Sequence, residues 1–407
     1  MKLAARSAMA RTTSALITAG LVVAAVGACG SDKTGDPAPA GPDVSNLDVG
    51  NYQTTPRVVG NAKNFKQARV RESQRLADYV ALPFEADPTY VKDNTNGIRP
   101  HIVLNRKGMG DLVINDTFDD VAKDLLAGWT NRWSTQETPD HKDRTLSIAV
   151  MEFPDAKTAA SVGPTLENDD FTFTPDNQPV PIAKYPNTKA HWRPTVSSIG
   201  SWTAHDRYVI FIKVDDDTSA PDLPALSAQV ERMLDVQIPL LDKFQPTPAD
   251  KLANIPLDPD GLLGRTLPTN PETPWRPDPD GTYAGRGVMA GLDSDPSLDF
   301  LTIGDLDLVA YGDATVFRSR TDQGAQALWQ KWTQSEDTEN RQSVEAPKGV
   351  DTEIRCSTDK PNSNYPEYQG IKLCMFKTGR YLVQAVARQI QDLHQKILAQ
   401  YTLLQAR

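Results

Sequence analysis

Residues 205–214 read HDRYVIFIKV, and residues 378–387 read TGRYLVQAVA. In both stretches a short turn is followed by Arg-Tyr and then by a run of mostly apolar residues. A turn before an apolar, β-branched run predicts a strand that begins directly after the turn. Because the motif occurs twice in one chain, it is the first indication of an internal duplication.

Further features recur in the same order around the two motifs. The first copy has an apolar strand ending at Phe153 and an Ala-rich helix at 155–162, and the second has a strand ending at Phe317 and a helix at 321–332. Each copy closes with a helix, and Pro239 is expected to interrupt the first of these. At a constant offset, the apolar positions Val230, Met233, Leu241 and Phe244 correspond to Ile390, Leu393, Tyr401 and Leu404.

The order of these features predicts the fold class. It favours an α+β chain of two related domains that arose by internal duplication. We expect each domain to be a small antiparallel sheet with helices on one face, in the manner of a ferredoxin-like fold.

Two more helices are predicted ahead of the first motif. Residues 65–80 have high helix propensity, and their Arg, Glu and Asp side chains are expected to cover the face away from the core. Residues 117–133 carry apolar side chains at helical spacing, among them Trp129 and Trp133. These tryptophans form either a ligand-stacking platform or the core stripe of an amphipathic helix, and the core stripe is favoured.

The composition limits the function classes. The chain has 39% hydrophobic and 24% charged residues, which is typical of a globular protein, and its formal net charge is −10. Nucleic-acid binding requires clustered Lys and Arg, and no dense basic run follows residue 11. We therefore expect no nucleic-acid partner.

The N-terminus predicts export and lipidation. Residues 1–28 have a basic start and an uncharged apolar stretch that leads to small residues, as in a secretory signal peptide. The segment Val26-Gly27-Ala28-Cys29 is similar to the lipobox of bacterial lipoproteins, a resemblance that implies acylation of the Cys29 thiol. The alternative is an ordinary cysteine that happens to follow a signal peptide. Acyl chains would hold the mature protein on the extracytoplasmic face of the cell membrane.

Composition shifts divide the rest of the chain. Residues 29–60 are rich in Gly, Pro, Asp and Ser and predict a flexible tether. Residues 246–284 are rich in Pro and turn dipeptides and predict a crossing between domains, pinned to both neighbours by apolar side chains. The expected α+β domains are residues 61–245 and 285–407. The pinning residues are Ile255, Leu257, Leu262, Leu263, Leu267 and Trp275.

Cys356 and Cys374 flank a polar, turn-rich loop between two expected strands. In an oxidising compartment we expect them to form a disulfide. The alternative, a zinc or redox site, needs closer spacing and more ligands, so no metal is expected. In the first copy we expect Trp192 and Trp202 to pack together where the second copy has the disulfide.

The sequence contains no recognisable catalytic motif. GxSxG, HExxH, P-loop and GxGxxG patterns are absent, and the five histidines are isolated from one another. The acidic loops at 215–217, 258–261 and 278–281 lack the spacing of calcium loops and favour solvated turns. We expect no catalytic residues and no cofactor.

Four stretches carry a resemblance to a known family. Together they resemble an uncharacterised lipoprotein family of mycolic-acid-containing actinobacteria such as Rhodococcus, Nocardia and Mycobacterium, whose domain has no known function. The repeat unit is also loosely similar to the extracellular sensor domains of mycobacterial serine/threonine kinases. These resemblances imply location and architecture but no reaction. The stretches are DVGNYQTTPR at 48–57, LADYVALPFEADP at 76–88, LDPDGLLGRTLP at 257–268 and VAYGDATVFRSRTDQGAQAL at 309–328.

These patterns favour a non-enzymatic lipoprotein that binds an envelope lipid, glycan or partner protein in a cleft between its two domains. The alternative is an envelope hydrolase or transferase with a dispersed active site, which two converging titratable side chains in a pocket would favour. A third possibility is an assembly factor without a small-molecule ligand.

Overall fold

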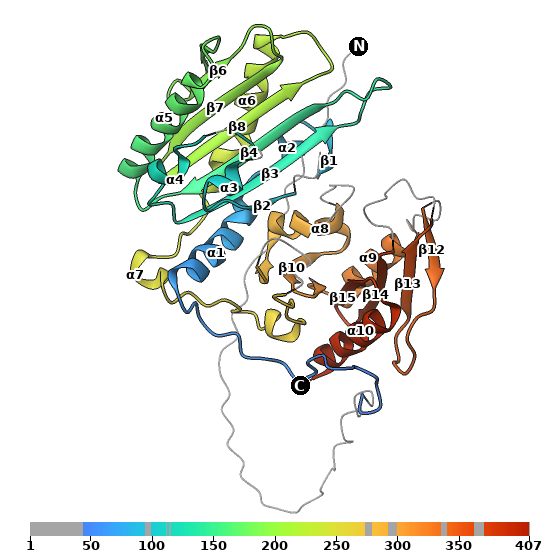
Figure 1. Ribbon diagram of the computed structural model, residues 1–407. Coiled ribbons are helices and arrows are strands. Elements are labelled where there is room, and N and C mark those ends of the chain that lie inside the picture. The colour runs from blue at the N-terminus through green and yellow to red at the C-terminus, as the bar shows by residue number, and fades with distance from the viewer. Residues whose placement is uncertain are drawn as a thin grey trace, which may run out of the picture. The chain divides into compact units, whose positions relative to one another are not determined.

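The computed structural model describes residues 44–93, 99–110, 112–113, 115–272, 279–291, 299–334, 340–361 and 370–406 (Figure 1). The predicted signal peptide, Cys29 and residues 29–43 of the expected tether lie outside these residues. Within the described residues, no helix is long and apolar enough to cross a membrane.

The N-terminal sheet has eight strands in the order β1-β3-β4-β8-β7-β6-β5, with β2 also paired to β3. Every pairing in it is antiparallel. The strands are β1 Tyr90–Asp93, β2 His101–Ile102, β3 Ala127–Thr135, β4 Arg144–Glu152, β5 Gln178–Pro181, β6 Lys189–Trp192, β7 Ser198–His205 and β8 Tyr208–Asp216.

The C-terminal sheet has seven strands in the order β9-β10-β11-β15-β14-β13-β12, again all antiparallel. The strands are β9 Gly281–Tyr283, β10 Leu306–Tyr311, β11 Ala314–Ser319, β12 Arg341–Val344, β13 Ile354–Asp359, β14 Lys372–Thr378 and β15 Tyr381–Ala387.

The two sheets have the same topology, so the predicted α+β class and duplication are confirmed. In each, three neighbouring strands of the sheet are followed along the chain by a helix, by four more strands and by a closing helix, and the last strand pairs with the third of the first three. Strand β2 is an additional strand of the first copy. The helices are α5 Ala156–Thr172 and α6 Leu223–Leu241 in the first copy, and α9 Asp322–Gln334 and α10 Ile390–Gln405 in the second. Pro239 does not interrupt α6, which continues to Leu241.

The Arg-Tyr motifs open the central strands β8 and β15, as predicted. In each copy the backbone carbonyl of the arginine accepts a hydrogen bond from a residue at the end of the neighbouring strand. The Phe153 N–H donates to the Arg207 carbonyl at 2.8 Å, and the Ser319 N–H donates to the Arg380 carbonyl at 2.9 Å. Phe153 therefore corresponds to Ser319, and the sequence alignment of Phe153 with Phe317 is wrong by two residues. A shift of two keeps the same face of a strand, so the apolar pattern could not reveal it.

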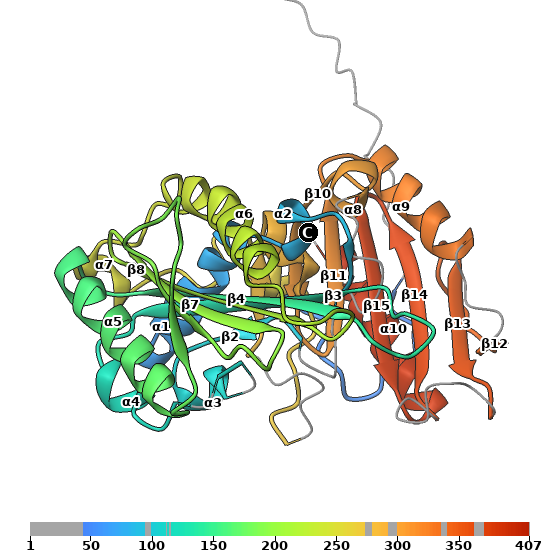
Figure 2. The same cartoon turned by 90° about the horizontal axis from the view of Figure 1, so that it is seen from above.

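Helices cover both faces of each sheet, so the prediction of helices on one face is wrong (Figure 2). Val209 and Phe211 of β8 pack with α5, whereas Ile210 and Ile212 share a cluster with α6. Likewise Leu382 of β15 packs on the α9 side and its neighbour Val383 on the α10 side. The unbroken apolar run in VIFI is typical of a strand that is buried on both faces, where alternation disappears.

The expected helix at 117–133 is wrong. Only α4, Phe118–Val121, is helical, and Trp129 and Trp133 lie in strand β3. Both side chains are buried in the core, as the core-stripe interpretation predicts. A spacing of four residues keeps side chains on one face of a helix and also on one face of a strand, so it did not distinguish the two.

The remaining helical segments lie before or between the strands, and all but α1 are short. They are α1 Phe65–Leu76, η1 Ala77–Tyr79, α2 Pro83–Ala86, α3 Arg106–Met109, α7 Ala249–Leu252, η3 Leu263–Arg265, η4 Gly285–Gly291 and α8 Asp299–Ile303.

The two sheets share one hydrophobic cluster. The Trp129 ring lies 5.5 Å from the Tyr283 ring, and Tyr283 lies 5.5 Å from Tyr311. Beside these rings, Arg286 donates hydrogen bonds to Glu85 at 2.7 Å and 2.9 Å. Among the described residues, the two sheets therefore pack against each other at these side chains.

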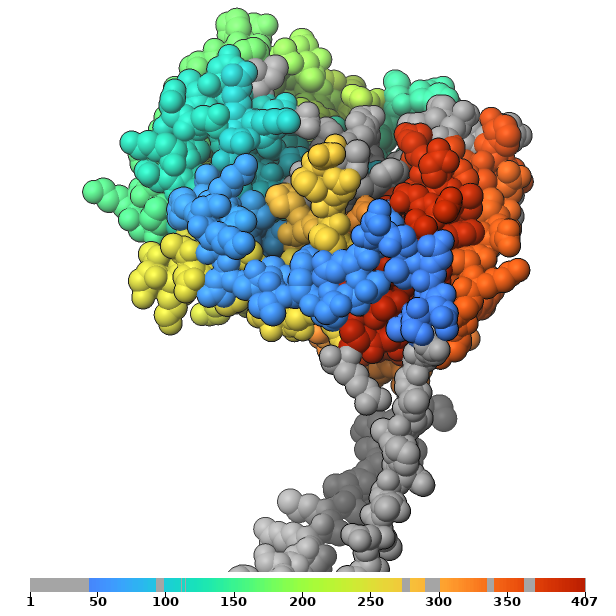
Figure 3. Space-filling model, turned by 60° about the horizontal axis from the view of Figure 1, so that its bottom comes forward, coloured from blue at the N-terminus to red at the C-terminus, as the bar shows by residue number. Residues whose placement is uncertain are grey.

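Residues 44–62 form a strap rather than part of a free tether. Tyr52 donates a hydrogen bond to Asp392 at 2.6 Å, and the Arg57 N–H donates to the Gly264 carbonyl at 3.0 Å. In Figure 3 this blue segment runs over the yellow crossing and beside the red α10. The expectation of a flexible tether up to residue 60 is wrong because its scattered apolar side chains, which lack a helical or strand period, pack on the C-terminal core. They are Val44, Leu47, Val49, Tyr52 and Val59.

The crossing is pinned on both sides, as its apolar residues predict. Ile255 and Leu257 pack with α1, whereas Leu262, Leu263 and Leu267 lie in the C-terminal core. Trp275 lies outside the described residues. The last residues of the crossing form β9, an edge strand of the C-terminal sheet.

Gly264→Ala is expected to loosen the strap, because a Cβ at this position would lie 2.4 Å from the backbone oxygen of Arg57. In limited proteolysis, the variant should be cut faster within residues 44–60 than the wild type. Gly110→Ala is the matched control, since its Cβ would lie at least 3.5 Å from other atoms. Equal cleavage rates in wild type and Gly264→Ala would show that the strap does not depend on this contact.

Candidate functional site

A pocket of about 490 Å³ lies between α1 and the first part of the crossing, and we call it the basic pocket. Helices α1 and α7 contact one another beside it. Three of its lining residues are cationic, one is acidic, and the remainder are polar or apolar. The lining residues are Arg71, Arg75, Thr247, Asp250, Lys251, Asn254, Ile255, Pro256 and Pro259.

The pocket exists because the polar side of α1 is buried, contrary to the prediction that it covers the helix surface. Arg71, Glu72 and Gln74 are all less than 8% exposed. Glu72 accepts hydrogen bonds from the Thr247 N–H and hydroxyl, both at 2.7 Å, and from Arg75 Nη1 at 2.7 Å. These bonds attach the crossing to α1 and leave the Glu72 carboxylate fully occupied.

Glu152, at the end of β4, lies close to this network. Burial and, secondly, the nearby Glu72 charge raise the pKa of its carboxyl from 4.5 to about 8, against the opposing effect of Arg207. The Arg207 guanidinium is 3.8 Å away, and Oε2 of Glu152 has no hydrogen-bond partner. Glu72 and Glu152 are only 1% and 2% exposed, so neither carboxyl group is accessible to a substrate.

Arg71 is the buried cation of the basic pocket, and among the described residues no carboxylate forms a hydrogen bond to it. Its Nη1 donates to the carbonyl and the hydroxyl of Thr282 at 2.7 Å and 3.0 Å, while its buried Nε has no hydrogen-bond partner. Burial and the neighbouring Arg75 charge lower the pKa of the guanidinium, which still remains protonated at neutral pH.

Lys251 and Asn254 lie at the exposed rim of the pocket. Among the described residues, no carboxylate forms an ion pair with Lys251. Asn254 accepts a hydrogen bond from the Asn61 side chain at 3.1 Å, so its own amide N–H groups can donate elsewhere. The rim therefore offers hydrogen-bond donors above the buried Arg71.

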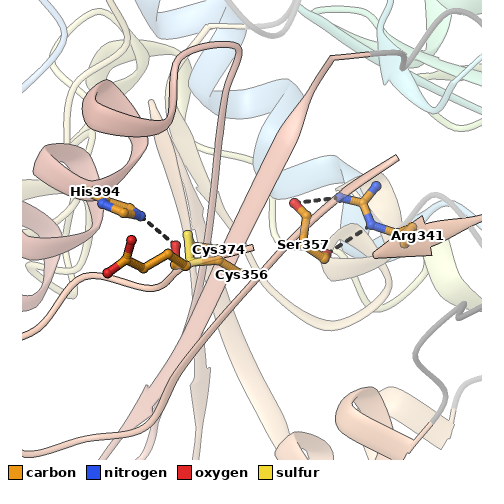
Figure 4. The surroundings of a disulfide bond; sticks show 6 residues. Arg341, Cys356, Ser357, Cys374 and His394 are labelled. Carbon is orange, nitrogen blue, oxygen red and sulfur yellow. Dashed lines mark hydrogen bonds between the residues drawn. A yellow bond between two sulfur atoms is a disulfide. The ribbon is translucent and has the colours of Figure 1, made fainter. Parts of the chain in front are cut away.

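The predicted disulfide between Cys356 and Cys374 is confirmed. The two residues lie directly opposite each other on β13 and β14, and a ring nitrogen of His394 is within 4.8 Å of both sulfurs (Figure 4). His394 is held by the Glu345 carbonyl at 2.8 Å. Because both thiols are covalently paired, this group does not form an open metal-ligand set.

The expected pairing of Trp192 with Trp202 is wrong. Trp192 packs on the α6 side of the N-terminal sheet, and Trp202 packs on the α5 side against Phe211. Counted from the two Arg-Tyr hairpins, the cysteines correspond to Ala190 and Ser201, which pair across β6 and β7. Small buried residues thus replace the disulfide in the first copy.

The other residues considered in the sequence have local partners. His191 is the most buried histidine, with Nδ1 3.3 Å from Glu167 and Nε2 3.6 Å from Asp170. In the acidic loops, Asp258 accepts hydrogen bonds from the Leu263 and Gly264 N–H groups, and Asp260 pairs with Arg318. Asp278 and Cys29 lie outside the described residues.

Sequence reasoning missed Arg71, Glu72, Glu152 and Lys251. The partners of Arg71 and Glu72, Thr282 and Thr247, lie 211 and 175 residues away along the chain. A helix that carries charges on most sides was the only local signal, and it is equally typical of a solvent-exposed helix.

Glu152→Gln is expected to change the pH dependence of stability. Between about pH 4.5 and pH 8 the folded wild type keeps a proton on Glu152 that the unfolded chain releases, so the wild type loses stability as the pH rises. The loss is a few kcal/mol at most, since one pKa unit corresponds to about 1.4 kcal/mol. Denaturant unfolding at several pH values should show a smaller loss in the variant, and Glu272→Gln at an exposed carboxylate should match the wild type.

Comparisons with known proteins place the chain in a family. The model of the N-terminal DUF7373 domain of unknown function matches residues 59–257, and the C-terminal DUF7373 model matches residues 262–407. The extracellular domain of PknH from Mycobacterium tuberculosis is weakly similar, with 9% identity and a TM-score of 0.30 over 42% of this chain and 97% of that domain. No curated protein matches the chain significantly. Since the two family models together cover most of the sequence, the chain belongs to the DUF7373 family.

Proposed function

We propose that this chain is a lipid-anchored, extracytoplasmic binding protein of an actinobacterial cell envelope and that it has no catalytic activity. The lipobox Val26-Gly27-Ala28-Cys29 supports the anchor, and the actinobacterial lipoprotein resemblance supports the location. The confirmed disulfide is consistent with an oxidising compartment outside the cytoplasm.

The observation that carries the binding function is the basic pocket. Its volume of about 490 Å³ is in the range of small-molecule sites, and its lining combines apolar walls with a few polar groups. The binding site is therefore formed by α1 and the crossing, and it differs from the cleft between domains that the sequence suggested.

Binding is favoured over catalysis by the accessibility of the titratable groups. An envelope hydrolase or transferase with a dispersed active site needs two converging groups that a substrate reaches. Glu72 and Glu152 interact electrostatically but are almost completely buried. The accessible side chains of the pocket, Lys251, Asn254 and Asp250, are typical of ligand recognition and include no activated nucleophile.

Cys29→Ala is expected to release the protein from membranes, because the acylated thiol is the proposed anchor. After cell fractionation the wild type should sediment with membranes and incorporate a labelled fatty acid, and the variant should do neither. Ser31→Ala, two residues downstream, is the matched control and should behave as the wild type. Retention of Cys29→Ala in the membrane fraction would contradict lipid anchoring.

Asn254→Trp is expected to block ligand binding by filling the basic pocket from its rim. Native mass spectrometry of the wild type, released from its own membrane in mild detergent, should detect a non-covalently bound small molecule that this variant lacks. Ala253→Trp, which adds the same side chain at an exposed neighbour outside the lining, should retain the molecule. An unliganded wild type, or equal occupancy in the two variants, would contradict binding at this pocket.

A further inference from the structure

We propose that the basic pocket binds an oxyanion, a phosphate or carboxylate group, through Arg71 at its base and Lys251 at its rim. This inference rests on the proposed function, in which the basic pocket is the binding site. It names the chemical class of the ligand, which nothing in the family assignment specifies.

The charge balance of the pocket favours an anion. Its described lining has three cations, Arg71, Arg75 and Lys251, against the single carboxylate of Asp250. Arg75 is already neutralised by Glu72, with 2.7 Å between Nη1 and Oε2. Arg71 and Lys251 therefore remain available, in a chain whose overall net charge is −10.

Arg71 has the chemistry to recognise an oxyanion, because guanidinium N–H groups match carboxylate and phosphate oxygens. Thr282 occupies Nη1 and the fold encloses Nε, so Nη2 is the donor left for a ligand. A buried cation without a counter-ion is unfavourable, so a bound anion would stabilise this side chain.

The other acidic groups near Arg71 are bound elsewhere. Asp258 and Asp260 act on Arg71 only through space. Asp258 accepts from the backbone N–H groups of Leu263 and Gly264, and Asp260 pairs with Arg318 at 3.3 Å. Neither carboxylate makes a hydrogen bond to Arg71, so a bound anionic ligand would be the counter-ion of its guanidinium group.

The pocket also indicates what the anion is attached to. A space of about 490 Å³ is larger than a bare phosphate needs, and Ile255, Pro256 and Pro259 give it an apolar wall. The ligand is therefore an anionic group on a compact body, such as a phosphorylated small molecule or the headgroup of an anionic lipid. Both sources present the same oxyanion to Arg71 and Lys251.

The test uses the full chain carrying Cys29→Ala, so that acylation does not itself cause membrane binding. Titration with inorganic phosphate, followed by calorimetry, probes the free anion. Flotation with phosphatidylglycerol vesicles, compared with phosphatidylcholine vesicles, probes the lipid headgroup. We expect binding in at least one of the two anionic arms and none to phosphatidylcholine; the arm that responds identifies the source of the anion.

Lys251→Glu should weaken that binding about tenfold or more, the effect of losing a charged hydrogen bond. Lys243→Glu is the matched control, because it makes the same charge change at an exposed lysine eight residues away, outside the lining. Arg71→Gln should have a larger effect, but its loss of the Thr282 bonds endangers folding, so Lys251 decides the outcome.

Absence of binding in both anionic arms, or equal effects of Lys251→Glu and Lys243→Glu, would overturn the oxyanion inference. If the wild type then still carries a neutral molecule that Asn254→Trp loses, the binding function stands and only the ligand class is wrong. If no molecule co-purifies and neither arm responds, both the inference and the proposed binding function fail.

Discussion

The structure depends on one constraint, which is that Arg71 and Glu72 of α1 are buried and need hydrogen-bond partners within the fold. Glu72 attaches the crossing through Thr247, and Arg71 attaches β9 through Thr282. Gln74 reaches toward the same region, since its amide lies next to Gly281. A single helix thereby connects the N-terminal sheet, the crossing and the C-terminal sheet, and the basic pocket lies beside these polar contacts.

Duplication supplied the two sheets, and divergence made them different. The Arg-Tyr hairpins, the central strands and the closing helices keep one topology in both copies. The second copy has a disulfide between β13 and β14, where the first copy has Ala190 and Ser201. The proposed site lies outside the elements that the two copies share, since it is formed by α1 and the crossing.

The sequence predicts well what depends on near neighbours. The hairpins at Arg207 and Arg380, the duplication and the cysteine pair follow from local patterns or simple counting. The helix expected at Trp129 and Trp133 failed because a spacing of four fits a strand as well as a helix. The basic pocket was not predictable, because Arg71 and Glu72 look solvent-exposed until partners more than 170 residues away are brought to them.

The strap has a mechanical consequence. If Cys29 is the lipid anchor, the chain from there to Val44 spans at most about 50 Å when fully extended, so the folded body stays close to the bilayer. Tension on the anchor would act first on the hydrogen bond between Asp48 and Gln395 and then on the bond between Tyr52 and Asp392, both at α10. It would reach Asn61, next to Asn254 at the pocket rim, only after the bond between Arg57 and Gly264 had opened. The strap thus shields the proposed binding site from forces that arise at the membrane.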